Sequence, residues 1–237
     1  MVEIDLNLPH FYEIQEIGDF PGTAKFRDPI IYFPCPQEGR EGAGLWLKVR
    51  AASGKSWVGV FAFGYSSPPA FSRVVSSPDP DRVCVIANGA AYIVKSDNPE
   101  HWLKIPVIPV LDVRLLPELG LMILSDFTRL TAYRNNTLAW QSPRVCWDDL
   151  KIVRITSEAI EGVGYDPTNS ITHERPFSVD LETGRTLLGG PSSIDGNQFG
   201  NTNSVDRHVD GNWPPTPIRV KPFKNVTIGC VVGTFEM

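Results

Sequence analysis

Short apolar runs recur along this chain at a constant spacing, with turn-forming residues between them and no helical periodicity. The runs are Leu45–Val49, Val83–Ile86, Leu121–Leu124 and, more weakly, Ile160–Val163. Equivalent residues follow one another at intervals of 38 residues: Trp46, Cys84, Met122 and Ile160. Regularly spaced short strands are typical of repeated antiparallel sheet, in which each unit buries its apolar face on the next.

Neighbouring runs form three pairs with the pattern of β-hairpins. The pairs are Leu45–Arg50 with Trp57–Phe63, Val83–Ala87 with Ala90–Lys95, and Lys151–Ile155 with Ile160–Tyr165. Gly54 supplies the turn of the first pair, and Asn88-Gly89 between apolar runs is among the strongest short hairpin signals. The sequence therefore predicts an all-β fold, an antiparallel meander of hairpins that is either propeller-like or a two-sheet sandwich.

The ends of the chain differ in texture from its middle. Prolines punctuate residues 1–44, and because proline cannot donate to a sheet ladder, this segment is predicted to be an irregular arm with at most a short edge strand at Ile30–Phe33. Residues 189–217 are rich in Gly, Asn, Ser, Asp and Pro and are predicted to form a polar loop. Val226–Phe235 is apolar enough to be a closing strand that pairs far back along the chain. We expect one all-β domain over residues 1–237.

Charge and hydropathy narrow the classes of partner. The 27 acidic and 22 basic residues give a net charge of −5, and the basic residues form no run. Nucleic-acid binders usually carry a basic patch, so no nucleic-acid partner is expected. The first 20 residues have no Lys or Arg and no apolar core of a secretory signal, and no stretch is long and apolar enough to cross a bilayer. We therefore expect a cytoplasmic protein with no membrane partner.

The four cysteines, Cys35, Cys84, Cys146 and Cys230, are widely spaced and include no CxxC pair. Thiol metal sites and redox pairs usually need closely spaced cysteines. Four reduced structural cysteines are expected, since Cys84 and Cys230 lie inside apolar runs.

One short segment resembles a known architecture. Phe177–Arg185, with Asp180, Thr183 and Gly184, is similar to the strand and turn that end a blade in quinoprotein-like β-propellers. Residues 83–188 are similar in texture to uncharacterised bacterial all-β proteins. The resemblance implies β architecture. It implies no quinone cofactor, because the blade pattern occurs once and no tryptophan-docking motif follows Gly184, and the residues identify no other cofactor.

The richest polar cluster is the predicted loop Tyr165–Glu174. In a catalytic interpretation, His173 acts as a general base that Asp166 or Glu174 orients, and Asn169 helps to bind the substrate. The alternative is structural, because Asp166 and Asn169 are turn formers whose side chains commonly bond their own backbone.

Two further candidates lie towards the C-terminus. Asp206, His208 and Asp210 alternate and would share one face of a strand, where they would suit a divalent metal; the alternative is that all three are solvated. Trp213, followed by Pro214, is the tryptophan with the strongest expectation of exposure and is a candidate binding residue.

The leading functional hypothesis is a non-enzymatic binding protein that acts through protein–protein contact, for example a bacterial immunity or accessory factor. It depends on the absence of the G-x-S-x-G, H-E-x-x-H, P-loop and G-x-G-x-x-G motifs. Two alternatives stay open. One is a hydrolase that uses the Tyr165–Glu174 loop, with or without a metal, and the other is a lectin-like module that binds carbohydrate through tryptophan.

Overall fold

The computed structural model describes residues 2–18, 28–34, 44–64, 71–169 and 171–190, and the backbone of residues 228–230. Apart from one turn of 3-10 helix at Pro117–Leu119, the regular elements in these ranges are all strands. The strands form four separate sheets. The all-β prediction is confirmed, and four sheets match the propeller-like alternative better than the two-sheet sandwich.

The first two sheets contain five strands each. The first sheet has the order β18-β3-β5-β4-β2, with β2 at Tyr12–Glu16, β3 at Ile30–Phe33, β4 at Gly44–Ala51, β5 at Ser56–Ala62 and β18 at Ile228–Cys230. The second sheet has the order β1-β6-β7-β8-β9, with β1 at Glu3–Asp5, β6 at Arg73–Ser76, β7 at Arg82–Ala87, β8 at Ala90–Lys95 and β9 at Trp102–Lys104.

The third and fourth sheets are four-stranded antiparallel meanders in chain order. The third contains β10 at Asp112–Leu116, β11 at Leu121–Ser125, β12 at Leu130–Arg134 and β13 at Thr137–Gln141. The fourth contains β14 at Asp148–Ile155, β15 at Ala159–Tyr165, β16 at Glu174–Asp180 and β17 at Thr186–Leu188. All three predicted hairpins are confirmed, as β4–β5, β7–β8 and β14–β15.

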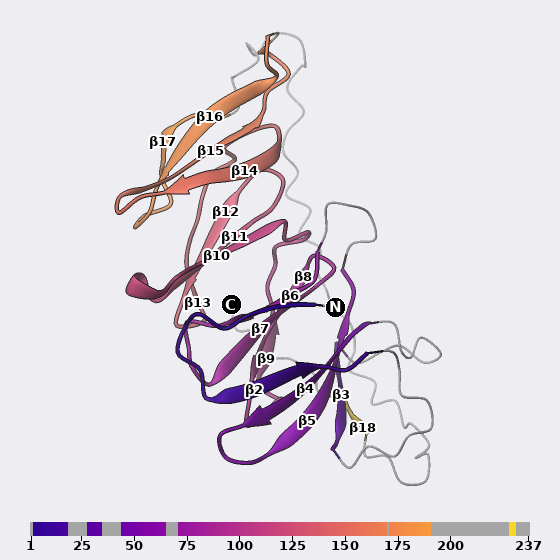
Figure 1. The fold of residues 1–237 in the computed structure, drawn as a ribbon. Coiled ribbons are helices and arrows are strands. Elements are labelled where there is room, and N and C mark those ends of the chain that lie inside the picture. Colours follow the sequence, from indigo (N-terminus) through magenta and orange to yellow (C-terminus); the bar gives the residue numbers. More distant parts are fainter. Residues whose placement is uncertain are drawn as a thin grey trace, which may run out of the picture.

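The four sheets follow one another in a stack, from the first sheet at the bottom of Figure 1 to the fourth at its top. Three hydrophobic clusters fill the spaces between successive sheets. Each cluster contains residues of two neighbouring sheets, for example Leu47 with Val85, Ile93 with Met122, and Ile123 with Phe177. The middle sheets are therefore buried on both faces, which explains why β7, β8 and β11 are continuous apolar runs.

The 38-residue interval corresponds to one sheet of the stack. The residues at this interval, Trp46, Cys84, Met122 and Ile160, lie on β4, β7, β11 and β15. Each of these strands is the second in its sheet when the count begins at β2, β6, β10 or β14. The interval thus predicted strand position correctly, but it did not predict which face a residue occupies. Cys84 packs towards the third sheet, whereas Met122 packs back towards the second. A slip of one residue within a strand is enough to reverse the face.

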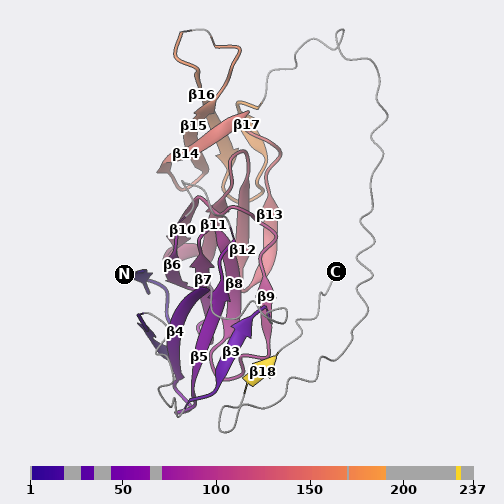
Figure 2. The ribbon, with the colours of Figure 1, turned by 90° about the vertical axis from the view of Figure 1, so that its right-hand side faces the viewer.

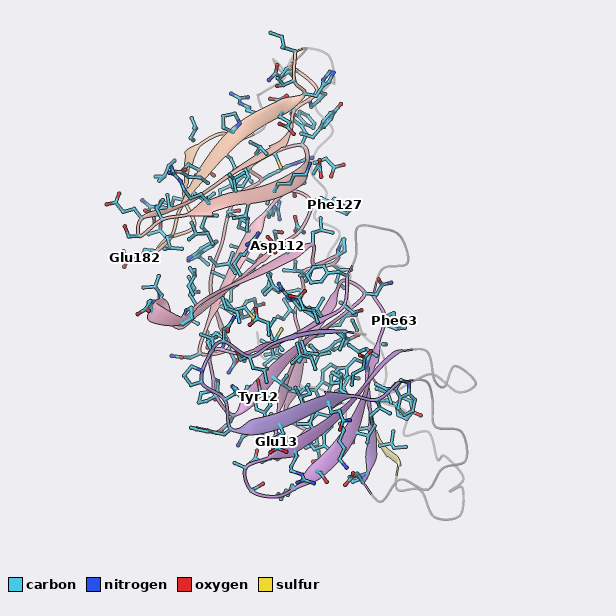
Figure 3. The ribbon with its side chains drawn as sticks, in the orientation of Figure 1. Tyr12, Glu13, Phe63, Asp112, Phe127 and Glu182 are labelled. Carbon is cyan, nitrogen blue, oxygen red and sulfur yellow. The ribbon has the colours of Figure 1, made fainter. Side chains whose placement is uncertain are left out.

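Residues 1–44 were predicted to be an irregular arm; the strand predicted at Ile30–Phe33 is confirmed as β3, but strands β1 and β2 were not predicted. Strand β1 pairs in parallel with β6, β2 pairs with β4, and β3 lies inside the first sheet between β5 and β18. Pro9, Pro29 and Pro34 stand between these strands and do not interrupt them. Figure 3 shows Tyr12 and Glu13 on β2; Tyr12 is buried in the cluster between the first two sheets, and its neighbour Glu13 is exposed.

Only part of the C-terminal segment for which predictions were made lies within the described residues. Strand β18 lies within the predicted closing strand and pairs in parallel with β3, some 200 residues earlier in the chain (Figure 2). Of the predicted polar loop at 189–217, Gly189 and Gly190 are described, and residues 191–217 lie outside the described ranges.

The segment that resembles a propeller blade forms the end of β16 and a tight turn. Asp180 Oδ1 accepts hydrogen bonds from Thr183 N at 2.7 Å and Thr183 Oγ1 at 2.6 Å. Gly184 follows with φ +71°, and a Cβ at this position would lie 2.6 Å from the ring of Trp140. The turn needs glycine both for its backbone conformation and for this close approach.

Two tryptophan side chains join neighbouring sheets by hydrogen bonds. Trp57 on β5 donates from Nε1 to the carbonyl oxygen of Ser96, just after β8, at 2.7 Å. Trp140 on β13 donates in the same way to Leu181, just after β16, at 3.0 Å. Ser96 follows β8 and Leu181 follows β16, and each of these strands is the third of its sheet when the count begins at β6 or β14. These bonds therefore fix how successive sheets are aligned.

We expect Trp57→Phe to lower the free energy of unfolding more than Trp102→Phe, by about 1–3 kcal/mol, because it leaves the buried Ser96 carbonyl without its donor. Trp102 is a matched control: it packs against the same cluster, and its Nε1 has no hydrogen-bond partner in the described part of the chain. Urea denaturation of the two variants measures the difference. Equal losses would show that the hydrogen bond contributes nothing beyond ring packing.

Candidate functional site

Asp166 follows β15 and its carboxylate is occupied by the turn that joins β15 to β16. Its Oδ1 accepts hydrogen bonds from Thr168 N at 2.9 Å and Thr168 Oγ1 at 2.6 Å, and its Oδ2 lies 3.3 Å from Arg175 Nη1. The side chain is only 4% exposed. Hydrogen bonds from Thr168, and then the Arg175 guanidinium, hold the pKa of this carboxyl below its ordinary value.

The same turn occurs one sheet earlier. Asp126 follows β11, and its Oδ1 accepts hydrogen bonds from Thr128 N at 2.7 Å, Thr128 Oγ1 at 3.2 Å and Arg129 N at 2.8 Å. An Asp-x-Thr turn thus connects the second and third strands of both the third and fourth sheets. This repetition supports the structural interpretation of Asp166, and the two Asp-x-Thr motifs are visible in the sequence once the repeat is known.

Asn169 and His173 organise the rest of this loop. Asn169 Nδ2 donates to the carbonyl oxygen of Glu174 at 2.7 Å, and His173 N donates to the carbonyl oxygen of Asn169 at 3.1 Å. His173 has φ +55°, and its ring centroid lies 6.1 Å from that of Tyr165. Within the described residues, the His173 ring has no hydrogen bond, so the structure does not join this ring to the Asp166 carboxylate.

A small polar hollow of about 170 Å³ lies beside this loop. Its lining includes His173, Glu174, Thr172, Tyr165 and Asp149, but not Asp166. The structure therefore brings together two of the three predicted catalytic residues. The sequence analysis missed Asp149, which enters the hollow from β14 with φ +51° and pairs with Lys151 Nζ at 2.6 Å. No motif signals this role, because the irregular register of the β14–β15 hairpin between Asp148 and Lys151 places Asp149 there.

The remaining predicted site residues lie outside the described ranges. These are Asp206, His208, Asp210 and Trp213. In the part of the chain that is described, no group of three His, Cys, Asp or Glu residues is arranged to hold a metal ion. None of the five described tryptophans is exposed, since each is buried or half-buried.

The outer face of the fourth sheet is the feature that sequence analysis missed. Strand β15 sends Ile160 towards the third sheet and Glu161 and Val163 outwards. On this outer face Val153 is 70% exposed and Leu188 is 57% exposed. We call this surface the end face; it consists of Lys151, Val153, Arg154, Glu161, Val163, Pro176, Ser178 and Leu188.

The end face is hollowed. A depression of about 330 Å³ is lined by Val153, Val163, Pro176 and Leu188, with Phe177 and Gly162 among its other lining residues. Side chains alternate between the two faces of each strand, and those that point outwards here include apolar ones. This surface is therefore partly apolar although it faces away from the stack. Apolar side chains that flank a shallow depression are typical of surfaces that bind another protein.

Charged side chains on the end face are paired within the chain. Arg154 Nη2 lies 2.5 Å from Glu161 Oε2 across the β14–β15 pair, and Lys151 Nζ lies 2.6 Å from Asp149. Both pairs are exposed, so each contributes little to stability. Glu174 also acts on Lys151, so carboxylates oppose both cations of this surface.

The hairpin loops lie at two opposite sides of the stack. Figure 3 shows Phe127, in the β11–β12 turn, on the side opposite to Glu182, in the β16–β17 turn. The carbonyl oxygen of Phe127 accepts a hydrogen bond from Leu150 N at 3.2 Å, which ties this turn to β14. The β11–β12 turn is thus held by the next sheet, whereas the end face has no further sheet against it among the described residues.

Comparisons with known proteins give no family. No protein-family model matches the chain, and no curated protein is similar to it in sequence. Among solved structures, the chain is similar to the N-terminal domain of Nup159, with 11% identity and a TM-score of 0.35 over 82% of this chain and 56% of that one. The chain thus spans little more than half the length of that domain.

A second solved structure is a complex from S. cerevisiae in which a Dbp5 variant is bound to Nup159, a Gle1 variant, IP6 and ADP. It has 9% identity and a TM-score of 0.22, over 78% of this chain and 70% of that one. Separately, no helix among the described residues has the length and apolar character required to span a membrane.

We expect Asp166→Asn to weaken the acid dependence of stability. The pKa of Asp166 is lower in the folded than in the unfolded protein, so its stabilising contribution is present above the unfolded value of about 3.9 and is lost as the pH falls through the folded value. Thermal unfolding from neutral pH down to about pH 3 measures this dependence. The variant should be less stable at neutral pH and should lose less stability on acidification.

Glu158→Gln is the control for this measurement, because Glu158 is exposed and lies outside the turn. It should leave the acid dependence as in the wild type. If Asp166→Asn and the wild type lose stability in parallel, the carboxylate does not stabilise the turn.

Proposed function

We propose that this protein is a non-enzymatic binding module that contacts another folded protein through the end face. The observation that carries this proposal is the exposure of Val153 and Leu188 around a hollow of about 330 Å³, at the end of a stack whose internal sheet faces are buried and mainly apolar. A surface of this kind is stabilised when a further folded surface removes it from water.

Covering these residues supplies part of the free energy that a specific contact requires. Fully burying a Val or Leu side chain contributes about 1.5–3 kcal/mol, so covering the exposed parts of Val153 and Leu188 contributes roughly 1–2 kcal/mol each. Val163 and Pro176 extend the apolar area between them. A few well-packed residues commonly supply most of the binding energy of an interface.

The charges of the end face favour a protein over a nucleic acid as the partner. Lys151 and Arg154 each lie beside a carboxylate, so neither offers an unopposed positive charge to a phosphate. A mixed surface of apolar and paired charged side chains suits another protein surface. A cytoplasmic immunity or accessory factor, built as a single all-β domain, is the role that fits such a module.

A hydrolase is the second candidate, because the polar hollow collects Asp149, Tyr165, His173 and Glu174. A general base needs a partner that orients its ring. The predicted partner Asp166 is engaged with Thr168 and Arg175, which makes this candidate the weaker of the two.

We expect the double variant Val153→Asp/Leu188→Asp to lose a protein that wild-type protein retains in co-purification from the native host, with recovery reduced about tenfold or more, because two unpaired charges would be buried in the contact. The readout is the amount of each associated protein, including a differently tagged copy of this chain, quantified by mass spectrometry.

Two matched controls test whether the loss is specific to the end face. Leu138→Asp places the same charge at an exposed leucine of β13, and it should leave recovery unchanged. His173→Ala alters the polar hollow and should also leave recovery of the associated protein unchanged. If His173→Ala abolishes the protein's effect in the native host while recovery stays intact, the hydrolase is favoured. If every variant recovers the same proteins as the wild type, the end face is not a binding surface.

A further inference from the structure

Strand β3 is held in the first sheet by its inner edge and by its packing. It pairs with β5 over four residues, from Ile30 with Val58 to Phe33 with Phe61. Phe33 is fully buried; its ring stacks on that of Phe61 with centroids 4.7 Å apart and meets that of Trp102 edge-on at 5.5 Å. These contacts are made without β18. We therefore expect β3 to keep its place, and its outer edge to keep its shape, when β18 is absent.

The outer edge of β3 is occupied by a smaller element, β18 (Figure 2). Strand β18 has three residues and, among the described strands, pairs with β3 alone. The register partners are Ile228 with Ile30, Gly229 with Ile31, and Cys230 with Tyr32. A parallel pair is slightly less stable per residue than an antiparallel one, and a strand of this length has few hydrogen bonds to lose. Phe33 lies beyond this register, so the edge is longer than its occupant.

The sequence separation between β18 and the rest of the described chain limits how strongly β18 is retained. The described residue that precedes it is Gly190, and residues 191–227 lie between the two. A tethered strand is favoured over an identical free strand only through its effective concentration, which is of millimolar order for short linkers and falls as the linker lengthens. A separate strand that pairs more tightly with β3 is therefore able to replace β18.

We propose that the outer edge of β3 is a strand-binding site, that β18 is its internal occupant, and that an extended apolar segment of another protein displaces β18 and pairs in parallel with β3. The edge of a strand is a template for such addition, because its unpaired N–H and C=O groups bond to an extended backbone.

The chemistry of the edge and of its occupant indicates the kind of segment that fits. Strand β3 reads Ile-Ile-Tyr-Phe and carries no charge. Residues 226–232, which include β18, read Val-Thr-Ile-Gly-Cys-Val-Val and are also uncharged. An uncharged segment rich in β-branched residues suits an extended conformation beside this edge. The site is separate from the end face, which lies at the other end of the stack in Figure 1, so neither proposal depends on the other.

Fluorescence anisotropy of a labelled peptide tests the proposal on the full chain. The probe is residues 225–234 with Cys230→Ser, which prevents disulfide formation. The receptors are the wild type and the full chain with Ile228→Pro/Gly229→Pro. Proline has no N–H for a sheet ladder, so the variant should lose the pairing of its own β18. It should bind the probe at least about tenfold more tightly than the wild type does, because its own strand no longer competes.

A probe with the same two prolines is the matched control and should bind neither chain. Near-ultraviolet circular dichroism checks that the tryptophan packing of the variant is that of the wild type. Equal binding of the first probe to both chains, or binding to neither, would overturn the proposal.

A cross-linking measurement leaves the C-terminal strand unaltered. Tyr32→Cys places a thiol opposite Cys230, since the two positions are register partners. Paired strands lie about 4.8 Å apart, which is within the range of Cα separations that a disulfide accepts. In a glutathione redox buffer, this thiol exchanges between Cys230 of its own chain and Cys230 of an added peptide of residues 225–234.

Mass spectrometry of the intact chain measures the two products. The share linked to the peptide should rise with peptide concentration and reach one half at about 1 mM, the order of the effective concentration of β18. The peptide with Ile228→Pro/Gly229→Pro should give at most a tenth as much linked product. If the chain links only to its own Cys230 at every peptide concentration, β18 is a permanent part of the sheet and the proposal fails.

Discussion

The structure depends on one constraint, which is that its middle sheets are apolar on both faces and must be covered on both. Val83 and Cys84 are neighbours on β7 and point in opposite directions, yet both are fully buried, one against the first sheet and the other against the third. A sheet of this kind is stable only inside a stack. The stack ends at a sheet whose outer face is polar or is covered by another segment. The outer face of the fourth sheet is only partly polar.

This constraint also decides where polar side chains are used. The strands contribute apolar side chains to the clusters, so the carboxylates and amides lie mainly in the turns, where they satisfy backbone donors. Asp126 and Asp166 hold equivalent turns, and Asp180 holds the turn that meets Trp140. A cluster of polar residues in such a fold is first of all a connection between strands. The distinctive surface is the exposed end of the stack.

Hairpins, whose strands have local partners, were predictable in full, whereas strands with distant partners were predicted only in part. The hairpins β4–β5 and β7–β8 join neighbouring runs through short turns, and the alternation of their residues identifies them. Strand β3 was predicted, but its partners were not. Strands β1 and β2 were missed; they pair with β6 and β4 across dozens of residues and have only three and five residues. Such short strands carry too few residues for a periodic signal, because their partners and not their own sequence select the extended conformation.

The sequence by itself determined that this chain is all-β, that its strands form repeated hairpins, and that the interval between equivalent strands is 38 residues. It also determined which residues form the turns, since Asn88-Gly89 and the Asp-x-Thr motifs act locally. Only the tertiary structure decided which face of each strand is covered. Alternation distinguishes two faces but does not say what lies against either, and for that reason the exposure of Val153 and Leu188, and the place of Asp149 beside His173, follow from the stacking and pairing of the sheets.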